Sequence, residues 1–355
     1  MKINHNFFSN LAFDIAEKNL GKTSRNPSVG CVVVKNNSVI SSAVTSVSGR
    51  PHAEYNALKK NINFKNSEMY ITLEPCTHFG LTPPCTNIIK KKKIKKIFYF
   101  FDDPDKRTYR RAKKVLKQKI IRLNKNKIRN KDFYKSYYLN KKKKYPLIDA
   151  KIAISKDYYT ISKKSKWITN ARSRKVAHLI RSRYDCVIST SKSINTDNSL
   201  LNCRIAGLNN NKPDLIIIDR HLKIKKNLKI FNRLENRKIY IFTSVTNKKK
   251  FSFFKKRKIK VVKINKLENK KDFEELFIKI FKIGKGRILV ETGIIFLNIL
   301  LKFKLINELY IFKSSKSLKN TGINNSDIKF IKRFSLNNQI KVNLDGDNLF
   351  KAKLK

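Results

Sequence analysis

The chain has 355 residues and a formal net charge of +57, from 82 Lys and Arg against 25 Asp and Glu. This length is long for one domain and sufficient for two, each with a core of its own. Apolar residues make up 41% of the sequence, which excludes a disordered polymer. We find no apolar run long enough to span a bilayer, so we expect no membrane association.

The strongly basic charge has two interpretations. A surface of this kind attracts phosphates, so nucleic-acid binding is the first. The second is compositional drift, because Lys, Asn, Ile, Phe and Tyr, which all have AT-rich codons, are abundant while Gly and Pro are scarce. The lysines also lie along the whole chain, in runs such as 90–93 and 141–144. We favour drift and expect no nucleic-acid partner.

The N-terminus and the cysteines bear on location. The first residues mix polar and charged side chains with apolar ones, and they lack the continuous apolar core and cleavage site of a signal peptide. Five cysteines form an odd number without a regular framework, which suits reduced thiols or a metal site. We therefore expect a cytoplasmic protein. The sequence leaves the oligomeric state open, a homo-oligomer included.

Helical and strand patterns alternate along the first part of the chain, which predicts an α/β layer architecture. Residues 124–146 are polar and rich in Lys and Asn, and we place a domain boundary near Pro146. The elements expected before it are a helix over 7–16, a strand within 26–37, a helix from Pro51, strands over 68–73 and 94–101, and helices from Pro83 and over 107–119.

After Pro146, near-continuous apolar segments predict strands of a sheet that is covered on both faces. Helical patterns lie between some of them, so this part reads as a second α/β domain. The expected strands cover 184–190, 213–219, 238–244, 259–264 and 287–292, and the expected helices cover 171–183 and 271–281.

Scarce residue types gather between positions 52 and 85. A hydrolytic zinc site takes three His or Cys ligands and leaves one position for water, and a nearby carboxylate must move protons. His52, Cys76 and Cys85 supply such ligands, and Glu54 supplies the carboxylate. The alternative is that the cysteines are small core residues and that His52 is a hydrogen-bonded core histidine. The order of the motifs favours the zinc site.

The spacing narrows the class of zinc site. H-x-E followed by P-C-x-x-C is the signature of zinc deaminases. Here eight residues, not two, separate the cysteines, so the pattern matches a relative with a longer spacer. A proline precedes each of His52, Cys76 and Cys85. We therefore expect each of these residues to lie at the start of a helix. Helix N-termini favour the thiolate, which is the ligand form.

The segments NPSVGCVVVK, PHAE and TLEPCTHFGLTPPC together resemble the family of bifunctional riboflavin-biosynthesis enzymes, in which a pyrimidine deaminase is joined to a reductase. The resemblance implies a cytidine-deaminase-like three-layer αβα domain over residues 1–145. It implies a dihydrofolate-reductase-like α/β domain over residues 146–355. Motifs that carry it are spread over residues 7–312.

In the first domain, the resemblance implies one zinc ion per chain, held by His52, Cys76 and Cys85, with Glu54 as the proton shuttle. The substrate would be a diaminopyrimidinone that carries a ribosylamino phosphate. Thr45 stands where the family has a histidine, so a substrate contact is expected to be lost there, and Asp105 replaces a common asparagine. The implied substrate contacts are Asn26, His78 and Asp103.

Residue types alone say less about the second domain. Trp167 is the only Trp, and a lone Trp is more often a core residue than a cofactor contact. Arg181 and Arg204 are candidate phosphate ligands, although a single basic residue in this chain is more often solvated. The segment Glu291–Gly293 could place backbone N–H groups against an anion.

The segments AKIAISKD, SKWIT, STSKSINTDNSLLNCR and LVETG extend the resemblance into this domain. They imply NADPH-dependent reduction of the ribose to a ribityl chain. The implied substrate contacts are Lys151, Ser165, Arg181, Leu201, Arg204 and Glu291, and the implied NADPH contacts are Ile154, Trp167, Ser193 and Asp197.

Departures from the family are heavier in this half. Tyr158 replaces a turn glycine, Asn198 and Ser199 replace an Asp-Pro pair, and Ile294 replaces a proline. We expect a bifunctional enzyme that deaminates the pyrimidine and then reduces its ribosyl group. The alternatives are a deaminase with a decayed reductase domain, a nucleic-acid (tRNA-type) zinc deaminase, and a non-enzymatic protein that binds RNA by charge.

Overall fold

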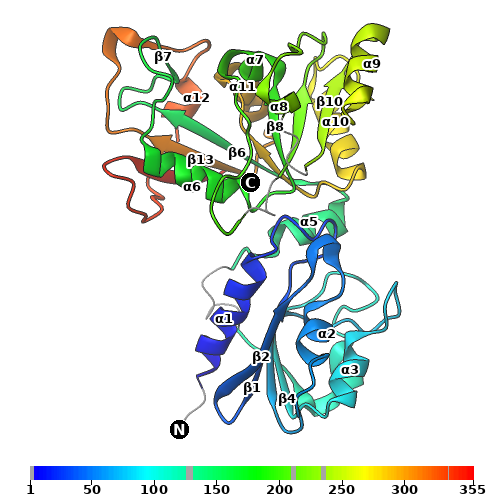
Figure 1. Cartoon of the computed structure of the whole chain (residues 1–355). Helices are drawn as coiled ribbons and strands as arrows, with labels where there is room; N and C mark the ends of the chain where they lie inside the picture. The colour runs from blue at the N-terminus through cyan, green and yellow to red at the C-terminus, as the bar shows by residue number, and fades with distance from the viewer. Residues whose placement is uncertain (1–3, 125–130, 209–212, 233–236, 335) are drawn as a thin grey trace. The chain divides into compact units, whose positions relative to one another are not determined.

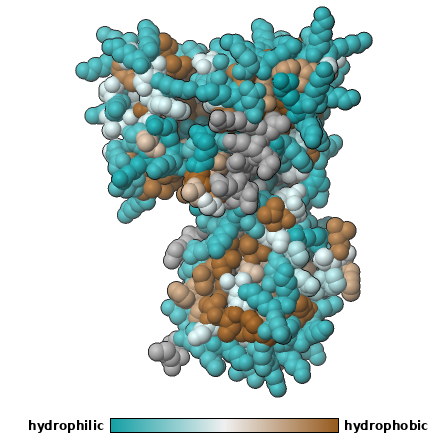
Figure 2. Space-filling model, viewed as in Figure 1, coloured by the Kyte–Doolittle hydropathy of each residue, from teal (hydrophilic) through white to brown (hydrophobic). Residues whose placement is uncertain are grey.

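The computed structural model describes residues 4–124, 131–208, 213–232, 237–334 and 336–355. The chain divides into two compact units, Met1–Tyr145 and Pro146–Lys355, and both are α/β units (Figure 1). Hydrophilic residues cover much of the visible face of each unit, with apolar residues exposed between them (Figure 2). Among the described residues, no helix combines the length and the apolar character needed to cross a membrane.

The first unit is built on a five-stranded sheet in the order β2-β1-β3-β4-β5. β1 pairs antiparallel with β2 and β3, whereas β3, β4 and β5 run parallel. The strands are β1 (Gly30–Lys35), β2 (Ser38–Val44), β3 (Glu68–Leu73), β4 (Lys96–Phe101) and β5 (Ile120–Arg122). The helices are α1 (His5–Glu17), α2 (Ala53–Leu58), α3 (Cys85–Lys91), α4 (Ala112–Leu116) and α5 (Lys135–Lys143), with short 3-10 turns at Val47–Gly49 and Lys117–Lys119.

The two faces of this sheet carry separate apolar clusters, because successive side chains of a strand point to opposite faces. Val32 and Val34 of β1 pack in one cluster with Phe8 and Ala12 of α1. Cys31 and Val33 of β1 join the main cluster of the unit, which also contains Ala57 of α2. Helices therefore cover both faces, which gives the predicted three-layer arrangement.

The second unit contains an eight-stranded sheet in the order β11-β10-β9-β8-β12-β6-β13-β15, and a two-stranded sheet formed by β7 and β14. The large sheet is parallel except for the pairing of β13 with β15. The strands are β6 (Leu147–Ile154), β7 (Ile161–Ser162), β8 (Cys186–Thr190), β9 (Asp214–Ile218), β10 (Ile239–Thr243), β11 (Lys260–Lys263), β12 (Arg287–Val290), β13 (Glu308–Lys313), β14 (Gly322–Ile323) and β15 (Asn348–Lys353).

The helices of the second unit are α6 (Ala171–Arg181), α7 (Ser191–Asp197), α8 (Lys229–Asn232), α9 (Lys248–Lys256), α10 (Lys270–Lys282), α11 (Ile294–Lys302) and α12 (Lys329–Lys332), with a 3-10 turn at Lys319–Thr321. β6, β12 and β8 are neighbours, so their carboxyl ends meet at one edge of the sheet. Ligands of open parallel sheets bind outside such carboxyl ends.

Two expectations about elements are wrong, and one helix was not expected. Cys76 does not start a helix, because it lies in an irregular segment after β3. The helix expected over 107–119 is reduced to α4 and a 3-10 turn, because the segment before Ala112 forms turns. The lysine-rich segment before Pro146 contains α5, and Tyr137 of that helix is buried in the main cluster of the first unit.

Candidate active sites in the two units

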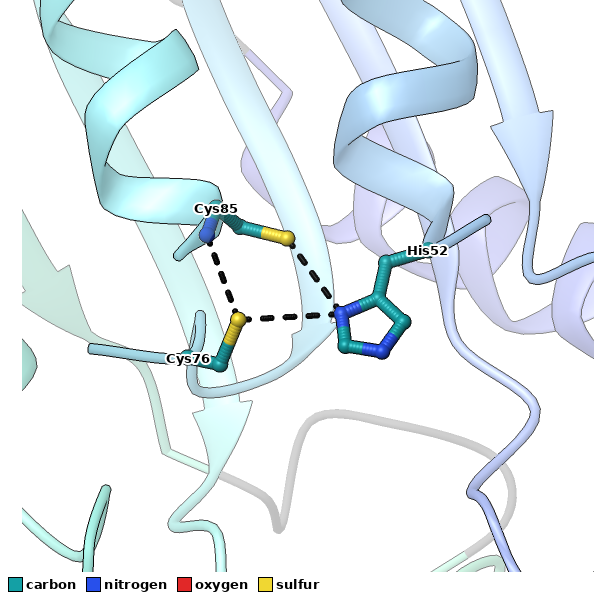
Figure 3. A group of neighbouring side chains, drawn as sticks. All are labelled: His52, Cys76 and Cys85. Carbon is teal, nitrogen blue, oxygen red and sulfur yellow. Dashed lines mark hydrogen bonds between the residues drawn. The ribbon is translucent and has the colours of Figure 1, made fainter. Parts of the chain in front are cut away.

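Three metal-binding side chains converge in the first unit (Figure 3). His52 is the N-cap of α2, Cys85 is the first residue of α3, and Cys76 follows the carboxyl end of β3. The Nδ1 atom of His52 lies 3.6 Å from Sγ of Cys76 and 3.4 Å from Sγ of Cys85. Cys76 Sγ also accepts a hydrogen bond of 3.2 Å from the backbone N–H of Cys85.

This donor set fits zinc. All three donor atoms lie within 4.8 Å of one another. Tetrahedral zinc with its usual Zn–N and Zn–S bonds separates a nitrogen and a sulfur ligand by about 3.6 Å, which is close to the two separations from His52 Nδ1. In Figure 3 both sulfur atoms point at Nδ1, whereas Nε2 points away. The cluster supplies three protein ligands and leaves the fourth position for water, as hydrolytic zinc sites require.

The two thiols are not equivalent. Hydrogen bonds donated by Cys85, together with one from His52, outweigh burial and lower the pKa of Cys76 to about 4. The hydrogen bond to Cys76, with burial, raises the pKa of Cys85. The hydrogen bond with Cys76 also raises the pKa of His52, and the positive charge of Arg50 opposes that rise. Cys76 therefore takes the thiolate form readily, which is the form that binds metal.

Glu54 is the second residue of α2 and lies beside this cluster. Its side chain is buried, and burial raises its pKa to about 7, with the charge of His52 acting in the opposite sense. Its carboxyl group is hydrogen-bonded to Cys85. A general acid–base group works best when its pKa lies near the operating pH. Glu54 thus has the place and the proton affinity of a proton-transfer group.

Asn26, His78 and Asp103, the implied substrate contacts, each form hydrogen bonds within the protein. Asn26 donates a hydrogen bond of 3.1 Å to the carbonyl of Gly49. His78 Nδ1 lies 3.0 Å from the hydroxyl of Thr108. Asp103 is buried, and its Oδ1 accepts hydrogen bonds from the Tyr137 hydroxyl and from the backbone of the next loop. Among the described residues, no hydrogen bond links any two of these three side chains.

Thr45 is turned into the fold. Its hydroxyl accepts a hydrogen bond of 3.0 Å from the backbone N–H of Val29, and the side chain is buried. This bond occupies the hydroxyl at the place where the family has a histidine. The hydrogen bond between Thr45 and Val29 therefore holds the residue that precedes β1.

Glu74 is a site residue that sequence reasoning missed. Its carboxylate accepts backbone hydrogen bonds from Asp103 at 3.2 Å, Arg110 at 2.9 Å and Ala112 at 3.0 Å. It thus fastens the loop after β4 to the segment that carries Cys76. The E-P-C motif was a possible signal, but the partners of Glu74 are 29 to 38 residues distant in sequence and only the fold brings them near.

An ionic cluster lies beside the carboxyl end of β12 and the middle of β6 in the second unit. Glu291 accepts two hydrogen bonds from Arg181, at 2.5 Å from Nε and 2.9 Å from Nη2. Lys151 Nζ lies 3.7 Å from the same carboxylate. Burial would raise the pKa of Glu291, but the charge and hydrogen bonds of Arg181 prevail and lower it to about 2. Burial lowers the pKa of Lys151, against the charge of Glu291.

Arg181 belongs to α6, which starts at the Asn170 cap. Its third nitrogen, Nη1, donates to the carbonyl of Asn202 at 3.2 Å, so the side chain is held by protein groups and is not a solvated surface arginine. Arg204 donates to the Asn202 side chain at 2.5 Å. Leu201 is buried, with a positive φ of 50°.

His178 was also missed, and it connects these parts. Its Nδ1 lies 2.8 Å from the Asn202 carbonyl, 3.3 Å from Arg181 Nη1 and 3.3 Å from the backbone N of Arg204. Burial and the neighbouring arginines lower its pKa to about 4, so it is neutral at pH 7. The pattern H-x-x-R on one helix face was the available signal.

The four implied cofactor contacts form smaller groups. Ser193 Oγ accepts a hydrogen bond of 3.1 Å from the N–H of Gly293, the N-cap of α11. Lys166 donates to the carbonyl of Asp197 at 3.0 Å and lies over the Trp167 ring. Ser165 and Trp167 hydrogen-bond to each other. Ile154 is buried at the end of β6 and bonds through its backbone to Ser314.

This region fits a phosphorylated cofactor. Trp167 is 52% exposed, so the core interpretation of that residue is wrong and its ring is accessible. Gly293 presents its backbone without a side chain, and an added Cβ would be in ordinary contact with Ser193 Oγ at 3.6 Å. No side chain caps the nine-residue α11, so its first N–H groups can meet an anion.

The lost turn glycine has a structural consequence. Tyr158 stands at φ 68°, in the left-handed region that favours glycine. Its ring lies under Lys313 Nζ at 4.4 Å and Lys332 Nζ at 5.7 Å. Cation–π contacts of this kind offset part of the backbone strain.

The folds and the two sites define the class of protein: a zinc-dependent deaminase unit followed by a reductase unit. Residues 2–101 match the family described as the cytidine and deoxycytidylate deaminase zinc-binding region, and residues 146–320 match the RibD C-terminal domain. Zinc and NADPH are the cofactors that these two domains imply.

The curated relatives and the solved structures agree. The riboflavin biosynthesis protein RibD of Buchnera aphidicola is 32% identical over 333 residues, which is 88% of each chain. That of Aquifex aeolicus is 32% identical over 64% of this chain and 65% of its own. A Thermotoga maritima diaminohydroxyphosphoribosylaminopyrimidine deaminase/5-amino-6-(5-phosphoribosylamino)uracil reductase matches with a TM-score of 0.80 and 25% identity, and the match covers 98% of each chain. The chain belongs to the RibD family, and it is a deaminase and a reductase of riboflavin biosynthesis.

Proposed function

We propose that the first unit hydrolyses the amino group from 2,5-diamino-6-(5-phosphoribosylamino)pyrimidin-4-one, and that the second unit uses NADPH to reduce the ribosyl group of the product to a ribityl chain. The observation that carries the proposal is the convergence of His52, Cys76 and Cys85 beside buried Glu54. The reactions that the Thermotoga relative is named for are the same two.

Each group of the first site has a task in this proposal. His52, Cys76 and Cys85 would hold the zinc, which when bound activates water at neutral pH. The carboxylate of Glu54 would accept one proton from the attacking water and pass it to the ring nitrogen, and it would then carry the remaining proton of the attacking oxygen to the departing amine. The nucleophilic oxygen replaces the amino nitrogen on the pyrimidine carbon, and ammonia leaves. Asn26, His78 and Asp103 would contact the substrate.

The second site is proposed to orient two ligands at the carboxyl edge of the large sheet. NADPH, when bound, supplies the hydride equivalent that reduces the opened ribose. Ile154, Trp167, Ser193 and Asp197 would contact it. Lys151 would hold the proton needed by the sugar, because burial makes its ammonium group more acidic than usual. Ser165, Arg181, Leu201, Arg204 and Glu291 would position the substrate, Arg181 through its pairing with Glu291.

Three finer points belong to the same proposal. One zinc ion per chain follows from the single cluster of three donors among the described residues. A cytoplasmic location suits the five cysteines, all of which are free thiols. The substrate is a small pyrimidine ribosyl phosphate and not a nucleic acid, and residues 1–145 and 146–355 are the deaminase and reductase domains.

A coupled assay tests the proposal. The zinc-loaded protein is given the diaminopyrimidine phosphate, and ammonia release is followed; NADPH is then added and its absorbance at the reduced-nicotinamide band is recorded. We expect one ammonia per substrate and one NADPH oxidised per deaminated product. Deamination of RNA or DNA without deamination of the small substrate would contradict it, as would ammonia release with no oxidation of NADPH.

A further inference from the structure

We infer that Arg50 binds the phosphate group of the deaminase substrate; this inference rests on the proposed function. Arg50 lies two residues before His52 in the segment that leads into α2. Its Nη1 donates a hydrogen bond of 2.8 Å to the hydroxyl of Thr82, which belongs to the spacer between Cys76 and Cys85. The guanidinium group thus bridges the two segments that carry the metal-binding side chains.

The Nη2 side of this guanidinium faces Gly80, which has no side chain and so lets a small group approach. A Cβ added there would lie 3.6 Å from Arg50 Nη2 and 4.0 Å from His78 Nε2. His78 is held through its other nitrogen, since Nδ1 is bonded to Thr108. Nη2 of Arg50 and Nε2 of His78 therefore both lie beside Gly80, and neither takes part in a described hydrogen bond. A phosphate oxygen is the acceptor that such a pair fits.

Several neighbouring cations pair with carboxylates, whereas Arg50 does not. Asp105 pairs with Arg107 at 2.8 Å and with Lys141 at 3.0 Å. Asp102 pairs with Arg110 at 3.4 Å. Arg50 forms no ion pair with any carboxylate in the described part of the chain, although it is partly shielded from solvent. Among the described residues, no carboxylate therefore reduces the charge that Arg50 can offer to an anion.

The chemistry of the group supports phosphate over other anions. A guanidinium presents a planar fork of N–H donors that matches two phosphate oxygens, and it stays protonated at every physiological pH. With Nη1 on Thr82, the remaining edge of Arg50 has Nε and Nη2 free to make such a pair. The fixed Thr82 contact holds the fork in place before the substrate arrives, which reduces the entropy cost of binding.

The test compares Arg50→Gln and Arg50→Lys with the wild type on two substrates, the diaminopyrimidine ribosyl phosphate and its dephosphorylated form. For Arg50→Gln we expect KM for the phosphorylated substrate to rise about 10–100-fold, because one to two charge-assisted hydrogen bonds are lost. The kcat value and all constants for the dephosphorylated substrate should change by less than about threefold. Arg50→Lys should recover only part of the affinity, because it keeps the charge and loses the fork.

The matched control is Lys65→Gln, which removes one exposed positive charge near the start of β3, at the other end of that strand from Cys76. It should leave both substrates unaffected. Equal losses on both substrates for Arg50→Gln, or no loss on either, would overturn the assignment. Failure of the wild type to release ammonia from either substrate would refute the proposed function itself.

A direct measurement of binding tests the role of Arg50 without relying on catalytic turnover. Calorimetric titration of the zinc-loaded Glu54→Gln protein with the phosphorylated substrate, with and without Arg50→Gln, should show the same 10–100-fold difference in Kd. Zinc content and thermal unfolding of each variant show whether the fold is intact. If Arg50→Gln fails to fold, Arg50→Lys still decides, since full wild-type affinity in that variant would exclude recognition by the fork.

Discussion

Glu54 shows how one buried side chain sets the chemistry of its surroundings. Its carboxyl group is 4% exposed, and burial raises its pKa to about 7. A carboxylate in water has its pKa near 4 and would be a weak proton acceptor at neutral pH. The protein environment therefore gives Glu54 the proton affinity that an acid–base group needs, while the ligand atoms of the metal cluster come from other residues.

We predict that Glu54→Gln keeps zinc and loses most deamination. The amide has nearly the same shape as the carboxyl group but cannot shuttle a proton, and acid–base catalysis contributes about 10²–10⁴-fold. Ammonia release measured beside metal content checks this. Glu68→Gln, the same change at the start of β3, is the control and should stay near wild-type activity. Turnover within a few-fold of wild type would remove Glu54 from this role.

At the scale of residues, the sequence predicts what is local and misses what the fold brings together. His52, Glu54 and the two cysteines can be predicted because their motifs are short and rare. Glu74 and His178 could not be predicted, because their partners are distant in sequence and each residue type is common. The environment of Arg50 was hidden for a further reason: 82 basic residues give no ground for choosing one of them.

Among helices and strands too, those with a clear local pattern are predicted from the sequence and the others are missed. Buried strands such as β3 and β9 can be predicted because their apolar runs are continuous and bounded by turn residues. The short helix α5 was missed, because lysines and an asparagine conceal its buried Tyr137 and the buried Tyr134 that precedes it. Tyr134, its N-cap residue, is 2% exposed; its hydroxyl lies 2.6 Å from that of Thr72 and donates to the Ser28 carbonyl at 3.0 Å. A lysine-rich helix is thereby part of the core of the first unit.

We predict that Tyr134→Ala destabilises the first unit by about 3–5 kcal/mol, which is typical when a buried aromatic side chain is removed. Tyr134→Phe should cost about 1–2 kcal/mol, since it keeps the ring and loses only the hydroxyl contacts. Denaturant unfolding followed by a probe in that unit gives both values. Tyr138→Phe, which removes one hydroxyl bond from the same helix, is the comparison. A cost under 1 kcal/mol for Tyr134→Ala would mean that α5 is not part of the core.

At the scale of the whole molecule, the two activities depend on separate sets of residues. The three zinc ligands and Glu54 belong to the unit Met1–Tyr145, whereas Lys151, Arg181 and Glu291 belong to the unit Pro146–Lys355. Each unit has its own sheet and its own apolar clusters. A change confined to the metal site should therefore act on one activity and one folding unit.

We predict that chelation separates the two activities. After dialysis against a zinc chelator, ammonia release should fall to background, because the cluster loses the ion that activates water. NADPH oxidation with the deaminated substrate should stay within about twofold of its starting rate. Zinc should restore deamination and magnesium should not, because thiolate and imidazole ligands disfavour magnesium.

Calorimetry on the same samples gives a second measurement. A ligand that binds only the folded state stabilises by mass action, so metal removal should lower the Tm of the first unit and leave that of the second unchanged. His52→Ala should reproduce the chelated state without a chelator, and further chelation should then have no effect on its Tm. Parallel loss of both activities on chelation, with full recovery of both on adding zinc, would show that the second unit also depends on the metal.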